Sequence, residues 1–130
     1  MAWKLIAALG VAALALTACS ADAREAQAAD AGRAFVAAEP AEACALLAPK
    51  TRKKLEKESG TDCATALQEV GLPAGGDVEG AEVAVESAQV RLADQTIFLA
   101  RFPEGWLVTA AGCQREDEDP AQPYDCEVES

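Results

Sequence analysis

The sequence contains no histidine, and aromatic residues make up only 5% of its 130 residues. Histidine is the commonest general base and the commonest metal ligand, so its absence argues against the usual hydrolytic and metal sites. Basic side chains are also scarce, with 11 against 22 acidic ones. The resulting net charge of −11 argues against nucleic-acid binding, which requires a basic surface. These deficits predict a protein without a cofactor or metal and with a core of small side chains.

Residues 1–18 have the organisation of a bacterial lipoprotein signal peptide. A short start with one positive charge, Lys4, precedes about twelve apolar residues, too few for a bilayer core that requires about twenty. The following Leu16-Thr17-Ala18-Cys19 is a lipobox, in which two small residues precede a cysteine whose thiol accepts a diacylglycerol. The alternative is an ordinary secretory signal with a chance cysteine, and the position and surroundings of Cys19 disfavour it.

Processing at this site predicts that the mature chain begins at Cys19 and is anchored by lipid at the extracytoplasmic face of the cell membrane. Two acyl chains give stable anchoring, whereas a single chain holds only marginally. Without Lys4, the mature chain has 10 basic and 22 acidic side chains. An anionic bilayer therefore repels the rest of the protein. Residues 19–27 are small and polar and predict a short tether with a reach of about 15 Å.

Four further cysteines remain once Cys19 carries lipid, and they are Cys44, Cys63, Cys113 and Cys126. An even number in an exported domain predicts two disulfides, for which three pairings are possible. Pairing Cys44 with Cys63 and Cys113 with Cys126 gives two local loops, one in each half of the chain. A zinc site is the alternative, but it usually has closely spaced cysteine pairs that are missing here.

The pattern of apolar residues predicts helices first and strands second. Over residues 28–72 the spacing is helical, with helices at about 28–38, from Pro40, over 50–58, and after a cap at Asp62. Over residues 78–112 the period is two, with a turn every eight to ten residues. Residues 113–130 predict a loop pinned to the sheet by a disulfide. The prediction is a single α+β domain over 28–130, with three to four short N-terminal helices packed on a roughly four-stranded antiparallel meander.

Several segments together resemble a family of small secreted lipoproteins of high-GC Gram-positive bacteria. They are Ala43-Cys44-Ala45-Leu46-Leu47-Ala48-Pro49, Cys63-Ala64-Thr65-Ala66-Leu67, Phe98-Leu99-Ala100-Arg101-Phe102 with Gly105-Trp106, Ala110-Ala111-Gly112-Cys113 and Pro123-Tyr124-Asp125-Cys126. The resemblance covers most of the mature chain, and its specific part is the motifs that contain cysteine. It implies an architecture like the cystatin-like or nuclear-transport-factor-like cone, in which helices pack into a curved sheet. It implies no catalytic residue, and the shortness of this domain disfavours a deep cavity.

Two groups of side chains are candidate binding sites, each with a plainer explanation. The aromatic residues fit either a ligand pocket or core packing, and packing is favoured in a core otherwise poor in large side chains; they are Phe98, Phe102, Trp106 and Tyr124. The acidic tract over 116–119 fits either a Ca²⁺ site or a solvated loop. The loop is favoured, because four consecutive carboxylates do not converge on one ion.

A basic cluster stands out in this acidic chain, consisting of Lys50, Arg52, Lys53, Lys54 and Lys57. Positive charge early in a helix opposes the helix dipole. The cluster fits contact with anionic lipid headgroups or a wall polymer, or a solvated polar helix, and the solvated helix is favoured.

The sequence predicts no enzyme. No histidine is present to activate Ser59 or Ser87, and no pair of carboxylates has a distinctive spacing. Two functions remain: a protein-interaction or structural module that binds an envelope protein, and a module that binds a small apolar ligand between helices and sheet. A packed interior favours the first, and an internal cavity lined by the aromatic residues favours the second.

Overall fold

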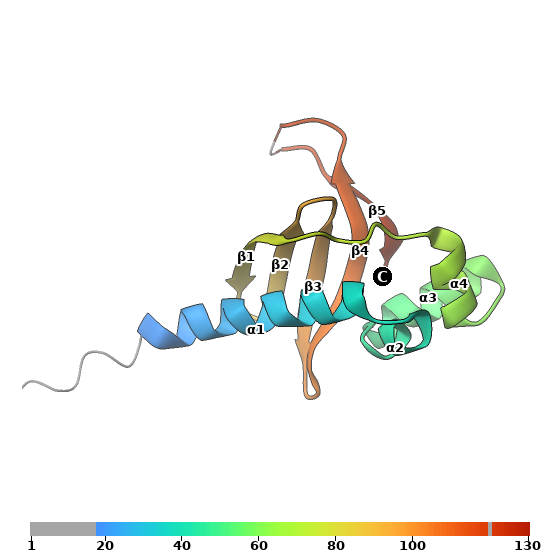
Figure 1. Cartoon of the computed structure of the whole chain (residues 1–130), viewed down its shortest axis with the longest axis horizontal. Coiled ribbons are helices and arrows are strands. Elements are labelled where there is room, and N and C mark those ends of the chain that lie inside the picture. The colour runs from blue at the N-terminus through green and yellow to red at the C-terminus, as the bar shows by residue number, and fades with distance from the viewer. Residues whose placement is uncertain (1–17, 120) are drawn as a thin grey trace, which may run out of the picture.

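In a computed structural model, which describes residues 18–119 and 121–130, four helices precede a sheet of five strands (Figure 1). The helices are α1 (Ala18–Ala37), α2 (Pro40–Ala45), α3 (Pro49–Ser59) and α4 (Cys63–Val70). The strands are β1 (Val78–Ala84), β2 (Ser87–Leu92), β3 (Thr96–Phe102), β4 (Gly105–Arg115) and β5 (Tyr124–Glu129). The predicted α+β class is confirmed. Apart from Ala18, the predicted signal peptide lies outside the described residues, and no helix within them has the length and apolarity to span a bilayer.

The first helix begins much earlier than predicted, so the flexible tether over 19–27 is wrong. These residues form the first turns of α1, and Cys19 belongs to that helix by its backbone. Nine of the twenty residues of α1 are alanine, which has the highest intrinsic helix propensity. The alanines, whose small side chains suggest flexibility, therefore favour a helix instead. At about 1.5 Å per residue, this helix is about 30 Å long.

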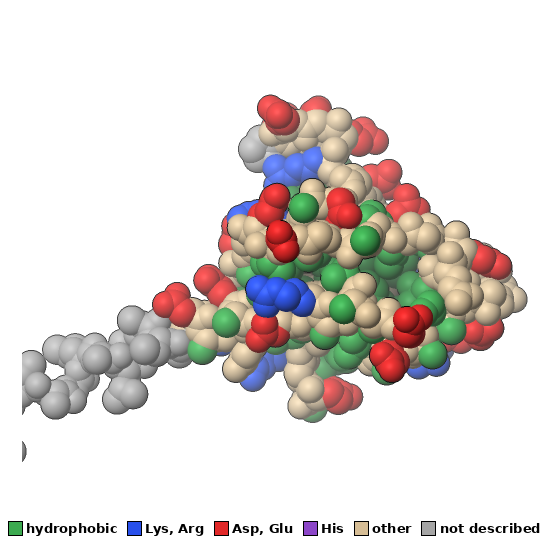
Figure 2. Space-filling view, in the orientation of Figure 1, with side chains coloured by type: hydrophobic (Ala, Val, Ile, Leu, Met, Phe, Trp, Pro, Cys, Tyr) green, Lys and Arg blue, Asp and Glu red, His purple; other side chains and the backbone are tan. Residues whose placement is uncertain are grey.

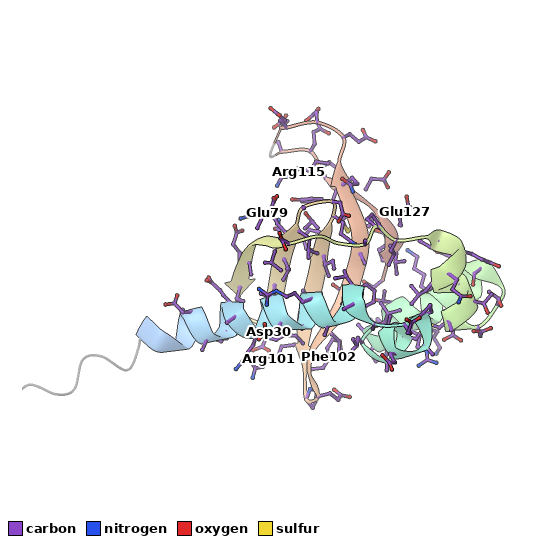
Figure 3. All side chains as sticks on the ribbon, viewed as in Figure 1. Asp30, Glu79, Arg101, Phe102, Arg115 and Glu127 are labelled. Carbon is purple, nitrogen blue, oxygen red and sulfur yellow. A yellow bond between two sulfur atoms is a disulfide. The ribbon has the colours of Figure 1, made fainter. Side chains whose placement is uncertain are left out.

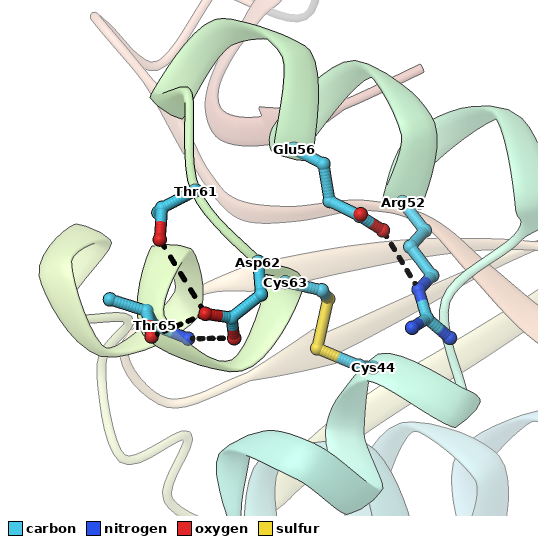
Figure 4. Close-up of a disulfide and its surroundings, with 7 residues drawn as sticks. All are labelled: Cys44, Arg52, Glu56, Thr61, Asp62, Cys63 and Thr65. Carbon is cyan, nitrogen blue, oxygen red and sulfur yellow. Dashed lines mark hydrogen bonds and ion pairs between the residues drawn. A yellow bond between two sulfur atoms is a disulfide. The ribbon is translucent and has the colours of Figure 1, made fainter.

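The other helices begin and end where local signals predict. Pro40 and Pro49 each stand at the start of a helix, where the missing N–H is not needed. Asp62 caps α4 by accepting a hydrogen bond from the backbone N–H of Thr65 at 3.1 Å (Figure 4). This bond, followed by that from the Thr65 hydroxyl, lowers the pKa of Asp62 below its ordinary value. Glycines in the left-handed conformation terminate α3 and α4.

The sheet is a meander in which each strand pairs antiparallel with the next along the chain, in the order β1-β2-β3-β4-β5. The predicted strand number of four is wrong, because part of the expected C-terminal loop over 113–130 is the fifth strand. Tyr124, Cys126 and Val128 alternate there with three acidic residues that are exposed. The period-two pattern of a strand is thus present, although the acidic residues at alternate positions make the segment resemble a charged loop. Strand β4 also continues beyond residue 112, to Arg115.

One face of the sheet packs against α1, which lies across the strands (Figure 1). This face carries Val90, Ile97 and Leu99, each at most 1% exposed. Gly32 of α1 approaches β2 so closely that a Cβ there would lie 3.1 Å from the nearest Val90 methyl carbon. The small side chains of α1 thus let the helix lie close to the sheet, and the core forms between them.

Both disulfides have the local pairing considered from the sequence. Cys44 is bonded to Cys63 and joins α2 to α4 by buried side chains (Figure 4). Cys113 is bonded to Cys126, its direct partner across β4 and β5. The cystine pairs therefore fix the helical subdomain and the C-terminal strand separately.

The segment after α2 extends the sheet beside β4. The Val108 N–H donates to the Leu46 carbonyl at 2.9 Å, and the Ala48 N–H donates to the Val108 carbonyl at 2.8 Å. This short parallel bridge continues the edge that β5 covers further along β4. It places the first turn of α3 beside the sheet, where the buried Thr51 hydroxyl donates to the Thr109 carbonyl.

Candidate functional site

The four aromatic residues selected from the sequence do not lie together. Trp106 belongs to the core on the face covered by α1. Phe98 and Tyr124 meet edge to face elsewhere, with their ring centroids 5.1 Å apart. Phe102 lines a separate hollow and lies beside Arg101 at the β3–β4 hairpin (Figure 3). A single pocket lined by all four side chains is therefore not formed.

Trp106 packs against a charged neighbour. Arg101 is its cross-strand partner, and the guanidinium carbon lies 5.8 Å from the centre of the Trp106 ring. A cation–π contact of this kind stabilises a partly exposed pair. The indole Nε1 is buried and has no hydrogen-bond partner among the described residues. Trp106 is thus held by packing and by Arg101 rather than by a polar contact.

The face of the sheet opposite α1 is open, and we call it the open face. It carries Ser87, Gln89, Phe98, Ala100 and Leu107, which alternate with core residues along their strands and are half-buried or exposed. Strand pairing sets these side chains beside one another: Ser87 with Ala100, Gln89 with Phe98, and Ala100 with Leu107. The open face is therefore one continuous surface built from three neighbouring strands.

A hollow of about 380 Å³ lies on the open face. Its lining includes Glu82, Ala84, Ser87, Gln89, Phe98 and Ala100. The side chains of Ala84, Ser87 and Ala100 are too short to fill the space above the strands. The floor is thus apolar at its centre, while polar side chains stand at its edge.

Tyr124 of β5 closes one end of the open face. Its hydroxyl accepts a hydrogen bond from Gln89 Nε2 at 3.1 Å, and its ring packs against Phe98. The guanidinium carbon of Arg115 lies 4.7 Å from the centre of the same ring. These three contacts fix the position of Tyr124, so this end of the open face is preorganised.

An ion pair between β1 and β2 forms the edge of the open face. Arg91 donates to a carboxylate oxygen of Glu82. This hydrogen bond, reinforced by the negative charge of Glu82, raises the pKa of Arg91. Both side chains are substantially exposed, so the pair is screened by water and contributes little to stability.

A second hollow, of about 450 Å³, adjoins the first at Thr109, which lines both. It is bounded by Phe102 at the end of β3 and by Ala48, Pro49 and Lys50 at the start of α3. The backbone bridge between residues 46–48 and Val108 brings these segments together. Together the two hollows extend the accessible surface from the β1–β2 hairpin to α3.

An apolar groove lies on the helical side of the molecule. Phe35 and Val36 at the end of α1, Leu67 of α4, and Leu72 and Pro73 after it enclose a volume of about 220 Å³. Figure 2 shows apolar side chains gathered in this depression between α1 and α4. None of the aromatic residues predicted to line a pocket contributes to it.

The charged candidates lie at two separate places. The acidic tract over 116–119 belongs to the β4–β5 connection, where the Asp117 carboxylate accepts from the Asp119 backbone N–H. Within the described residues, no group of three or more acidic or cysteine side chains is arranged to hold a metal ion. The basic cluster lies on α3. All five of its members are at least partly exposed.

Sequence reasoning missed the open face and its hollows. The available signal was weak, because the small residues Ala84, Ser87 and Ala100 stand on the same side of their strands as larger ones such as Gln89 and Phe98. Comparison with known proteins adds no further guide: the chain matches no protein-family model, and neither a curated protein nor a solved structure shows significant similarity to it.

Proposed function

We propose that this protein is a non-catalytic lipoprotein of the cell envelope, anchored by lipid on Cys19, whose domain binds an envelope protein through the open face of its sheet. The extracytoplasmic location and the likeness to lipoproteins of high-GC Gram-positive bacteria belong to this proposal. Its support at the N-terminus is the lipobox ending at Cys19. The two disulfides are also in keeping with an exported protein.

The observation that carries the proposal is the hollow on the open face. A sheet face of this kind is normally either charged and solvated or covered by another layer. Here Phe98, Ala100 and Leu107 leave apolar surface half-exposed beside polar rim residues. Apolar surface rimmed by polar groups is typical of protein-binding sites.

The size of the open face indicates a weak, reversible complex. Three strands at about 4.8 Å spacing and about six residues at about 3.3 Å per residue give roughly 300 Å². A standard stable interface buries about 800 Å² on each partner. The adjoining hollow at Phe102 enlarges the surface toward this value.

A small apolar ligand is the less supported alternative. The groove between α1 and α4 has the right apolar lining, but its volume of about 220 Å³ is below the range of about 300–1,000 Å³ typical of ligand sites. The two larger hollows lie on the sheet surface, with exposed residues such as Glu82 and Ser87 in the lining of the first. They fit projecting side chains of a protein better than an enclosed ligand.

The test is to place a large charged side chain in the hollow. Ala100→Arg and Ser87→Arg fill it from two strands, and Ala34→Arg makes the same kind of change on the exposed side of α1. Envelope proteins that co-purify with each variant from cross-linked membranes are quantified by mass spectrometry. We expect the two hollow variants to lose the main partner at least tenfold and Ala34→Arg to retain it.

The same preparation tests the anchor. The intact mass of the parent protein is expected to correspond to a chain starting at Cys19 with a diacylglycerol and four hydrogens fewer, while Cys19→Ser carries no lipid. A lipid-free parent mass would contradict the anchor. Equal partner recovery from all three arginine variants would contradict the open face as the binding site.

A further inference from the structure

Helix α3 concentrates positive charge in a strongly acidic molecule. Five of its eleven residues are basic and two are acidic, which gives a net charge of +3. The rest of the chain holds six basic and twenty acidic side chains, the 11 and 22 of the whole less those on α3. A local region of opposite sign is therefore built on a single helix.

The lysines of α3 share one side of the helix. At about 100° per residue, a stripe of about 100° contains all four of them, namely Lys50, Lys53, Lys54 and Lys57. We call this set the lysine stripe. Thr51 and Leu55 point elsewhere and are buried, so they fix α3 on the domain while the stripe faces solvent. The distance along the helix axis from Lys50 to Lys57 is about 10 Å.

Most of the lysine stripe is free of intramolecular ion pairs. Arg52, outside the stripe, pairs with Glu56 at 3.0 Å (Figure 4). Lys54 lies 3.8 Å from Glu58 and 3.6 Å from Glu129. In the part of the chain that the structure describes, Lys50, Lys53 and Lys57 have no carboxylate within 4.0 Å. Three exposed ammonium groups are thus available to an external partner.

This arrangement is unfavourable for α3 on its own. Like charges three or four residues apart repel each other on a helix surface. Positive side chains in the first turn also oppose the helix dipole. An anionic partner would relieve both effects, whereas a folding role does not explain them.

The stripe is remote from the proposed anchor. Cys19 belongs to the first turn of α1, which is about 30 Å long, and α3 lies beyond the other end of α1 (Figure 1). Charges are screened within about 8–10 Å at physiological ionic strength. When α1 stands away from a bilayer that holds its start, the stripe therefore lies beyond the reach of the charges on that bilayer.

We propose that the lysine stripe of α3 binds a linear, phosphate-bearing polyanion of the cell envelope outside the bilayer. Successive phosphates along such a chain meet Lys50, Lys53 and Lys57 in turn, with Lys54 between them. The ammonium groups act as point charges and require no fixed geometry of the ligand. The position outside the bilayer rests on the proposed anchor at Cys19, whereas recognition of phosphate does not.

The test measures binding of long-chain sodium polyphosphate to the lipidated protein in nanodiscs of neutral lipid. Between 50 and 200 mM NaCl, release of counterions predicts a slope of log K against log[NaCl] of about −2, since each of three phosphate contacts contributes about −0.7 on a single-stranded polyanion. The double variant Lys53→Gln/Lys57→Gln is expected to weaken binding at least tenfold at 50 mM NaCl. It is also expected to reduce the magnitude of the slope from about 2 to below about 1. Arg24→Gln/Arg33→Gln removes the same charge from α1 and is expected to change affinity less than twofold.

Three outcomes would overturn the proposal. The first is the absence of polyphosphate binding at 50 mM NaCl. The second is an equal loss of binding in both double variants, which would make the effect one of net charge alone. The third is a loss of binding in nanodiscs that contain about 30% anionic phospholipid, relative to neutral nanodiscs at the same 150 mM NaCl, because the stripe would then be occupied by its own bilayer. Ala100→Arg, which tests the open face, is expected to bind polyphosphate normally, so the two proposals fail separately.

Discussion

Val85 at the tip of the β1–β2 hairpin offers a sharp test of the backbone geometry. It is the first residue of a two-residue turn and has a φ of 54°, and its side chain is 77% exposed. A positive φ at the first of the two turn residues and not at the second is the pattern of a type II′ turn, in which glycine normally occupies the first position. A β-branched side chain in this region is strained. The Val85 carbonyl accepts a hydrogen bond from Arg24, which ties the tip to α1.

The expected gain from relieving this strain follows from two quantities. A positive φ costs an ordinary residue about 1–2 kcal/mol, whereas glycine adopts it without steric cost. About 0.4–1 kcal/mol of this gain is offset, because glycine is more flexible in the unfolded chain. Since the Val85 side chain is exposed, its replacement removes little buried apolar area. We therefore expect Val85→Gly to raise the free energy of unfolding by about 0.5–1 kcal/mol and Tm by about 3 °C.

Urea denaturation followed by circular dichroism measures this difference, and a thermal scan measures Tm. Glu86→Gly is the matched control, because it introduces the same residue at the neighbouring tip position, which does not have a positive φ. It is expected to lower the free energy of unfolding by about 0.4–1 kcal/mol, because it adds flexibility to the unfolded chain and relieves no strain. Unchanged or lower stability of Val85→Gly would refute the reasoning from strain.

Two further predictions concern buried and capping hydrogen bonds. Gln95, 3% exposed, accepts from the Gly112 N–H at 2.8 Å and donates to the Pro73 carbonyl at 2.9 Å. Gln95→Ala leaves both groups without a partner and is expected to cost about 2–4 kcal/mol in urea denaturation, whereas a loss below about 1 kcal/mol would contradict this role. The lowered pKa of Asp62 means that its charged form stabilises the fold above its ordinary pKa of 3.8, and that this contribution is lost as the pH falls through the folded value. The stability difference between the parent and Asp62→Asn should therefore be largest near neutral pH and vanish in acid, and a difference independent of pH would exclude the carboxylate charge as its source.

Local signals predicted the helical half well because each acts within a few residues. Pro40, Pro49 and Asp62 each restrict or satisfy the backbone at a helix start, whatever the tertiary structure. Prediction fails where composition and propensity point to different structures. The small and polar residues before residue 28 suggest flexibility although the alanines among them favour a helix, and the acidic residues around Val128 obscure a strand.

The open face was not predictable because it depends on strand register. Ser87, Ala100 and Leu107 are distant in sequence and become neighbours only when β2, β3 and β4 pair. The register of β3 against β4 also shifts near Phe98, and no local pattern sets that shift. The ion pairing of the lysine stripe depends in the same way on a distant residue, since Lys54 meets Glu129 of β5.

The most direct test of the proposed binding function is site-specific photo-cross-linking in living cells. A photoreactive amino acid is placed at Ala100 in the hollow or, as a control, at Ala34 on the exposed side of α1. We predict a discrete adduct with one envelope protein from position 100 after illumination and none from position 34. No adduct from position 100, or the same adduct from both positions, would contradict a partner-binding role of the open face.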